Sequence, residues 1–151
     1  MAHPMQHLEP KQAWAYLKRH PGALFVDVRM EIEALYVGHP PGAVHIAWYE
    51  FPDMQVDAKK FAEQVLREAG STERPVVLLC RSGQRTVPAG EALEAAGFRE
   101  VVNVLHGFEG EADAHFQRGH INGWRFNRLL WEQMQPLAGA AIAPVRRRPF
   151  P

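Results

Sequence analysis

Hydrophobic positions along the chain fall into two alternating patterns. Short runs are apolar at nearly every position: residues 23–29, 43–48, 76–80 and 101–105. Other segments carry apolar residues on one helical face: residues 10–19, 58–69 and 87–96, with a shorter candidate at 30–36. Strands that are apolar throughout are buried on both faces, and their alternation with amphipathic helices is typical of a parallel sheet. The pattern therefore predicts an α/β fold with helices on both faces of the sheet.

Turn and cap residues define the boundaries of these elements. Asp57 is a suitable N-cap for the helix at 58–69, and Gly70 ends it. Two prolines and two glycines exclude regular structure at 38–42. The apolar spacing from Trp124 to Glu132 predicts a short C-terminal helix, whereas the charged stretch 107–123 supports no assignment. We expect one domain over residues 1–135 and an extended C-terminal tail over 136–151.

Composition narrows the possible functions. The chain has 151 residues, 17 basic and 17 acidic, so a broad surface for nucleic acid or anionic membrane is not expected. Its single cysteine cannot form an internal disulfide, and the N-terminus lacks the apolar core of a signal peptide. A cytoplasmic protein is the expectation. The eight histidines show no tight pairing of the kind metal-binding helices use, so no metal site is expected.

The single cysteine, Cys80, lies at the end of the predicted strand 76–80, before the loop that leads into the next helix. The connecting loop is short and rich in turn formers: Arg81, Ser82, Gly83, Gln84, Arg85 and Thr86. Such a loop directs several backbone N–H groups to one point, and the helix dipole adds positive potential there. A thiol at that point tends to ionise, and the thiolate is the reactive species. The alternative is an inert, buried cysteine at a strand end. A glycine-containing loop with arginine at both ends favours the reactive interpretation.

The segment from Cys80 to Thr86 resembles the active-site loop of the rhodanese family, the sulfurtransferases. Three further elements are similar to rhodanese motifs: Val26-Asp27-Val28-Arg29, the stretch Gly38–Ile46, and Val104–Phe108 followed by Trp124. The similarity covers roughly residues 8–133. The chain departs from the family pattern at Pro40, at Phe108 in place of a second glycine, and in a longer connection between Gly107 and Trp124.

The resemblance implies a rhodanese-like fold with a central parallel sheet of about five strands. It also implies a double displacement in which Cys80 takes the outer sulfur of an anionic donor such as thiosulfate and passes it to cyanide or a thiol. No cofactor is implied. The donor would be bound by the loop residues Arg81, Ser82, Gly83, Gln84, Arg85 and Thr86. Arg81 is expected to face a donor and Arg85 to bond inward, while Asp27 and Arg29 support the loop or form only a strand-end ion pair.

Two other functions remain open from the sequence. Phosphatases and arsenate reductases of related fold use a cysteine loop one residue longer than the four residues between Cys80 and Arg85. A persulfide carrier that hands sulfur to a dedicated partner would need the same loop as an enzyme.

Overall fold

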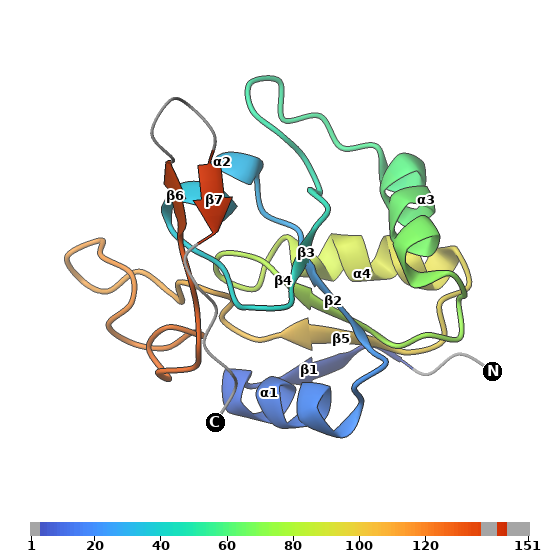
Figure 1. Cartoon of the computed structure of the whole chain (residues 1–151), viewed down its shortest axis with the longest axis horizontal. Coiled ribbons are helices and arrows are strands. Elements are labelled where there is room, and N and C mark those ends of the chain that lie inside the picture. The colour runs from blue at the N-terminus through green and yellow to red at the C-terminus, as the bar shows by residue number, and fades with distance from the viewer. Residues whose placement is uncertain (1–3, 137–141, 145–151) are drawn as a thin grey trace.

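The computed structural model describes residues 4–136 and 142–144, and it contains a five-stranded parallel sheet (Figure 1). The strand order is β1-β5-β4-β2-β3. The strands of this sheet are β1 (Gln6–Leu8), β2 (Leu24–Asp27), β3 (Val44–His45), β4 (Val76–Leu79) and β5 (Val101–Val104). The helices are α1 (Pro10–Arg19), α2 (Glu31–Tyr36), α3 (Ala58–Ala69) and α4 (Thr86–Ala95). The predicted fold class is confirmed.

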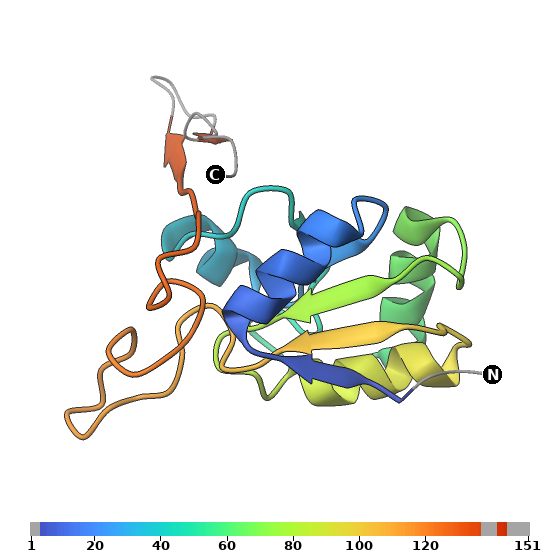
Figure 2. The same ribbon diagram turned by 90° about the horizontal axis from the view of Figure 1, so that it is seen from below.

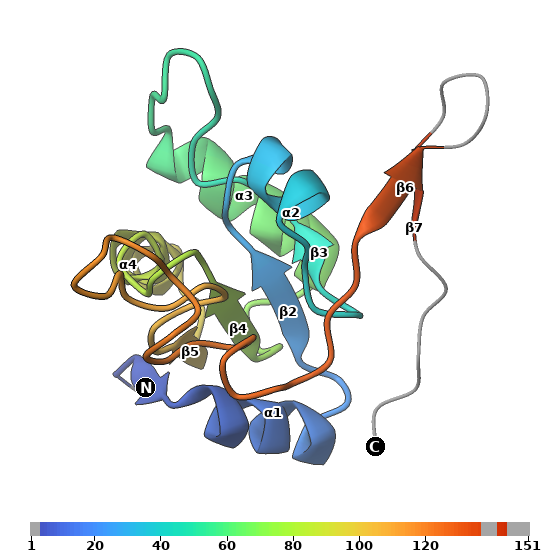
Figure 3. The same cartoon turned by 90° about the vertical axis from the view of Figure 1, so that its left-hand side faces the viewer.

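The two faces of the sheet bury alternate residues of the same strands. On β4, Val76 and Leu78 pack with α3 and α4, whereas Val77 and Leu79 pack with α1. The period of two follows from strand geometry, which points successive side chains to opposite faces. Figure 2 shows α1 lying across one face, and Figure 3 shows α3 and α4 on the other side of the strands.

The cap residues of α3 act as the sequence predicts. The Asp57 carboxylate accepts a hydrogen bond from the backbone N–H of Lys60 at 3.0 Å. The helix ends at Gly70, whose left-handed conformation (φ 79°) suits a residue without a Cβ. Between these caps Phe61 and Val65 are buried against the sheet. Local capping and an apolar stripe therefore account for this helix.

The structure differs from the sequence prediction at both edges of the sheet. The edge strand β1 has no apolar run and is revealed only by its pairing, with Gln6 opposite Val102 and Leu8 opposite Val104. At the other edge, the expected strand 43–48 is reduced to Val44–His45. An edge strand such as β1 buries less surface than a central strand, so its hydrophobic signal is weaker.

The predicted C-terminal helix is wrong. Residues 124–128 form turns, and the left-handed conformation of Arg128 (φ 60°) does not fit a continuous helix. Trp124 is fully buried and packs on Phe25, with ring centroids 5.5 Å apart. Further on, Glu132 forms an isolated antiparallel bridge with His39. Tertiary contacts thus hold this segment at the carboxyl ends of the strands, on the left of Figure 1.

The chain after this segment forms a second, two-stranded sheet. It pairs β6 (Met134–Pro136) with β7 (Ile142–Pro144) in antiparallel register. Residues 137–141 and 145–151 of the predicted tail lie outside the described residues. Within the described ranges, no helix has the length and apolar character needed to cross a bilayer.

We expect Trp124→Ala to lower the free energy of unfolding by about 3–5 kcal/mol, because it removes a fully buried aromatic side chain. The substitution also removes the indole hydrogen bond to the carbonyl of Leu130 (2.8 Å). Urea denaturation followed by circular dichroism measures the loss. Phe126→Ala is the matched control, since Phe126 is 46% exposed and should change stability little. Equal stability of the two variants would contradict the anchoring role of Trp124.

Candidate active site

Cys80 lies at the carboxyl end of β4, directly before the loop that leads into α4. The residue is 1% exposed, yet its sulfur has polar neighbours. The backbone N–H of Gly83 donates a hydrogen bond to Sγ at 3.1 Å, and the Thr86 hydroxyl lies 3.6 Å from Sγ. Gly83 adopts φ 91°, a conformation that favours glycine. The thiol is therefore buried but not enclosed in hydrocarbon alone.

The loop residues divide into exposed and inward-facing positions. Arg81 and Gln84 are exposed, Ser82 and Gly83 are half-buried, and Thr86 is buried. The sequence predicts several amides converging on the sulfur. Among the hydrogen bonds of the described residues, the one from a main-chain amide to Sγ comes from Gly83. The exposed Arg81 leaves its guanidinium accessible to an anion.

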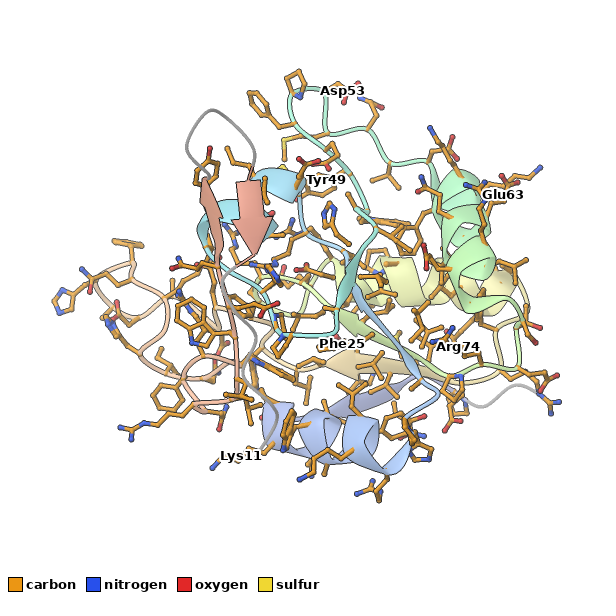
Figure 4. All side chains as sticks on the ribbon, viewed as in Figure 1. Lys11, Phe25, Tyr49, Asp53, Glu63 and Arg74 are labelled. Atoms are coloured by element: carbon orange, nitrogen blue, oxygen red, sulfur yellow. The ribbon has the colours of Figure 1, made fainter. Side chains whose placement is uncertain are left out.

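The guanidinium of Arg85 is turned away from solvent and bonds to an element outside the loop. It reaches α2 and forms a two-pronged ion pair with Glu33, with N–O distances of 2.6 and 2.9 Å. The guanidinium also lies 5.3 Å from the ring centroid of Tyr49, which belongs to the segment after β3 and is labelled in Figure 4. Arg85 therefore ties the start of α4 to two other elements.

The ion pair changes the titration of both partners. Burial by itself raises the pKa of Glu33, but the hydrogen bonds and charge of Arg85 outweigh it and hold that pKa below its ordinary value. Burial by itself lowers the pKa of Arg85. The hydrogen bonds and charge of Glu33, with smaller contributions from Tyr49 and Cys80, outweigh burial and raise that pKa above its ordinary value. The guanidinium stays charged near the thiol.

Asp27 and Arg29 form a buried ion pair at the end of β2. Arg29 donates to the two carboxylate oxygens of Asp27 at 2.9 and 2.7 Å and to the carbonyl of Gly38 at 2.6 Å. Its guanidinium carbon lies 4.5 Å from the ring centroid of Phe108, whose N–H bonds to the carbonyl of Cys80. The pair thus reaches the cysteine through Phe108.

The turn after β5 contacts the cysteine loop directly. The N–H groups of Phe108 and Glu109 donate to the carbonyls of Cys80 and Arg81 at 2.7 and 2.9 Å. Gly107 directly precedes these two residues with φ 62°, and a Cβ there would collide with the Cys80 carbonyl oxygen. The close approach of these two backbones therefore requires glycine at position 107.

Four residues linked to the thiol or its loop, directly or through one another, were not predicted as site residues: His7, Glu33, Asn103 and Gly107. Asn103 could have been recognised from the sequence, because it is a polar residue inside the apolar run 101–105. The structure shows that it is 1% exposed. Buried polar side chains need hydrogen-bond partners. Glu33 carried no comparable signal, since an acidic residue in the first turn of a short helix is common.

The arrangement suits a nucleophilic sulfur that carries negative charge. An amide donor, a helix start and a nearby guanidinium each stabilise an anion. A search with family models matches residues 9–114 to the rhodanese-like domain. The chain belongs to the rhodanese-like family of sulfurtransferases.

Relatives of this rhodanese-like chain include enzymes named for sulfur transfer. Thiosulfate sulfurtransferase GlpE of Pseudomonas syringae is 32% identical over 69% of this chain and 84% of its own length. The crystal structure of Rv0390 from M. tuberculosis covers 85% of this chain and 97% of its own, with 40% identity and a TM-score of 0.73. The polysulfide-sulfur transferase of Wolinella succinogenes is 29% identical, covers 68% of this chain and 69% of its own, and has a TM-score of 0.52.

We expect Glu33→Gln to destabilise this rhodanese-like domain by about 1–3 kcal/mol near neutral pH, because Arg85 loses an ionised partner. The folded-state pKa of Glu33 is lowered, so its contribution is complete above the ordinary glutamate value of about 4.3 and is lost as the pH falls through the folded value. Denaturation of the wild type and of Glu33→Gln at several pH values should show the difference in free energy of unfolding disappearing in acid. Glu31→Gln, an exposed change on the same helix, is the control. A gap that stays constant into acid would contradict the ionic role.

We expect Gly107→Ala to lower stability by at least about 2 kcal/mol, since alanine disfavours this φ and its Cβ collides with backbone. Thermal unfolding measures the loss. Gly22→Ala supplies the comparison, because a Cβ at Gly22 meets nothing within 4 Å. If both variants unfold at the wild-type temperature, the contact between this turn and the cysteine loop is not needed.

Proposed function

We propose that this chain is a thiosulfate sulfurtransferase that carries sulfane sulfur as a persulfide on Cys80. One observation carries the proposal: the Gly83 N–H donates to Sγ at 3.1 Å in a loop that leads into a helix start. Such a donor favours the thiolate, which attacks in the first displacement and is restored in the second. The match to the rhodanese-like family supports it independently.

The reaction divides into two displacements at sulfur. In the first, the Cys80 thiolate attacks the outer sulfur of thiosulfate, a new S–S bond forms, and the electron pair of the broken bond leaves with sulfite. In the second, cyanide attacks the outer sulfur of the Cys80 persulfide, and thiocyanate departs as the thiolate is restored. A thiol acceptor would instead leave as its own persulfide. Charge and atoms balance in each step, and ping-pong kinetics follow from the covalent intermediate.

Two loop features support a small anionic donor. Arg81 is exposed at the loop, where its guanidinium can meet the sulfonate oxygens of thiosulfate. Arg85 is paired with Glu33, so in this proposal it does not bind the donor. It fixes the start of α4 in place and keeps a positive charge near Sγ. The similarity to a polysulfide-sulfur transferase makes polysulfide a second donor to test.

The carrier and the phosphatase remain the alternatives. A carrier would accept sulfur once and release it only to its partner. The spacing of four residues between Cys80 and Arg85 favours the shorter sulfurtransferase loop over one that surrounds a tetrahedral phosphate.

We expect intact-mass spectrometry after incubation with thiosulfate to show a gain of one sulfur atom, removed by cyanide. Cys80→Ala should show no gain, and the assignment is unambiguous because the chain has one cysteine. Steady-state thiocyanate formation from thiosulfate and cyanide should fall to background in the same variant.

The outcomes separate the three functions. A mass gain with no steady-state turnover would identify a carrier and overturn the enzyme. Hydrolysis of an aryl phosphate that depends on Cys80, without any mass gain, would indicate a phosphatase. Thiocyanate formation unchanged in Cys80→Ala would remove Cys80 as the nucleophile.

A further inference from the structure

A line of polar side chains connects the buried thiol to the surface on the far edge of the sheet. Cys80 Sγ lies 3.6 Å from Thr86 Oγ1, which lies 2.5 Å from Asn103 Oδ1. Asn103 Nδ2 in turn lies 3.0 Å from Nδ1 of His7. The three residues after Cys80 come from α4, β5 and β1. Thr86 and Asn103 are almost fully buried, whereas His7 is exposed.

The direction of these hydrogen bonds decides what the thiol meets. In the arrangement above, Thr86 donates its one hydroxyl proton to Asn103 and turns a lone pair toward Sγ. That lone pair can accept from an S–H group but cannot stabilise a thiolate. Asn103 donates to His7, so Nδ1 of His7 must carry no proton. This direction favours the protonated thiol.

The opposite direction uses the same residues but needs a longer Thr86–Asn103 contact, because 2.5 Å suits O–H···O whereas N–H···O needs about 2.7 Å or more. The oxygen and nitrogen of an asparagine amide are nearly the same size, so a half-turn of the Asn103 amide exchanges them. Its nitrogen then donates to Thr86, and the Thr86 hydroxyl is free to donate to Sγ. Asn103 Oδ1 now faces His7 and accepts a proton from Nδ1. This direction favours a thiolate.

We propose that His7 is a positioning residue for Cys80: a proton held at Nδ1 of His7 sets, through Asn103 and Thr86, a hydroxyl hydrogen bond aimed at Sγ. Protonated imidazole carries Nδ1–H at all times, whereas neutral imidazole carries it in one tautomer only. No proton travels through the amide. His7 exchanges its proton with water, and the thiol proton leaves to solvent separately.

Other charged groups lie at both ends of this line. At the thiol they are Arg85 with Glu33, the Asp27–Arg29 pair on β2, and the exposed Arg81. Near His7, Glu9 lies 3.5 Å from His106. These charges act on the thiol through space. The test must therefore separate their electrostatic effect from the effect of the hydrogen bonds that link His7, Asn103, Thr86 and Cys80.

Alkylation of Cys80 by iodoacetamide measures thiolate reactivity without requiring sulfur transfer. The inference takes from the proposed function only that Cys80 is the reacting group, and this readout survives if the chain transfers no sulfur. With the Thr86 hydroxyl present, we expect His7→Gln to slow alkylation about three- to tenfold near pH 6, the net scale of one ordinary hydrogen bond. His20→Gln, at the far end of α1, should leave the profile unchanged.

A double substitution distinguishes the line from a through-space field. Thr86→Val removes the hydroxyl while keeping the side-chain shape, so His7→Gln should have no further effect in that background. If Thr86→Val does not fold, Thr86→Ala removes the same hydroxyl with less bulk. Identical pH profiles for wild type and His7→Gln would overturn the proposal. So would an effect of His7→Gln that persists without the Thr86 hydroxyl.

Discussion

The fully buried guanidinium of Arg29 is the constraint on which the site depends. A charge without solvent must be paired and hydrogen-bonded, or the fold loses several kilocalories per mole. Arg29 pairs with the two oxygens of Asp27, donates to the carbonyl of Gly38 and lies against the face of Phe108, while its Nη1 is buried without a hydrogen-bond partner among the described residues. The same group therefore joins the end of β2 to the turn before β3 and to the segment after β5. These three pieces surround the end of β4, where Cys80 lies.

The cysteine loop is held from several sides rather than by its own residues alone. The turn at Gly107 fits against the carbonyls of Cys80 and Arg81, and Arg85 extends to Glu33 on α2. Each tie comes from a different element at the carboxyl edge of the sheet. Such support keeps the Gly83 amide aimed at the sulfur, and a donor fixed before reaction costs no reorganisation when charge develops.

Polar contacts and apolar packing meet at the same sulfur. Cys80 belongs to the core cluster under α3 and α4, yet its Sγ faces an amide and a hydroxyl. A weakly solvated sulfur feels each nearby dipole more strongly than it would in water. The orientation of one threonine hydroxyl therefore matters here, and Asn103 on the neighbouring strand β5 and His7 on the edge strand β1 bear on that orientation.

Local patterns in the sequence predicted much of the fold. The central strands, the four helices and the caps of α3 were readable because each depends on the residues of its own segment. The edge strand β1 was not readable, since three largely polar residues are extended only by pairing with β5. The segment around Trp124 has helical spacing, but burial of the indole against Phe25 directs the chain into turns. A periodic pattern competes with tertiary contacts, and here the contacts decided the conformation.

The amino-acid sequence by itself determined the class of fold, the position of Cys80 at a strand end, and the loop that follows it, because these depend on neighbours along the chain. Only the tertiary structure decided what surrounds the sulfur. Glu33, Asn103, His7 and Gly107 lie between 23 and 73 residues from Cys80 along the chain, and no local pattern records which distant side chains a parallel sheet brings to one edge.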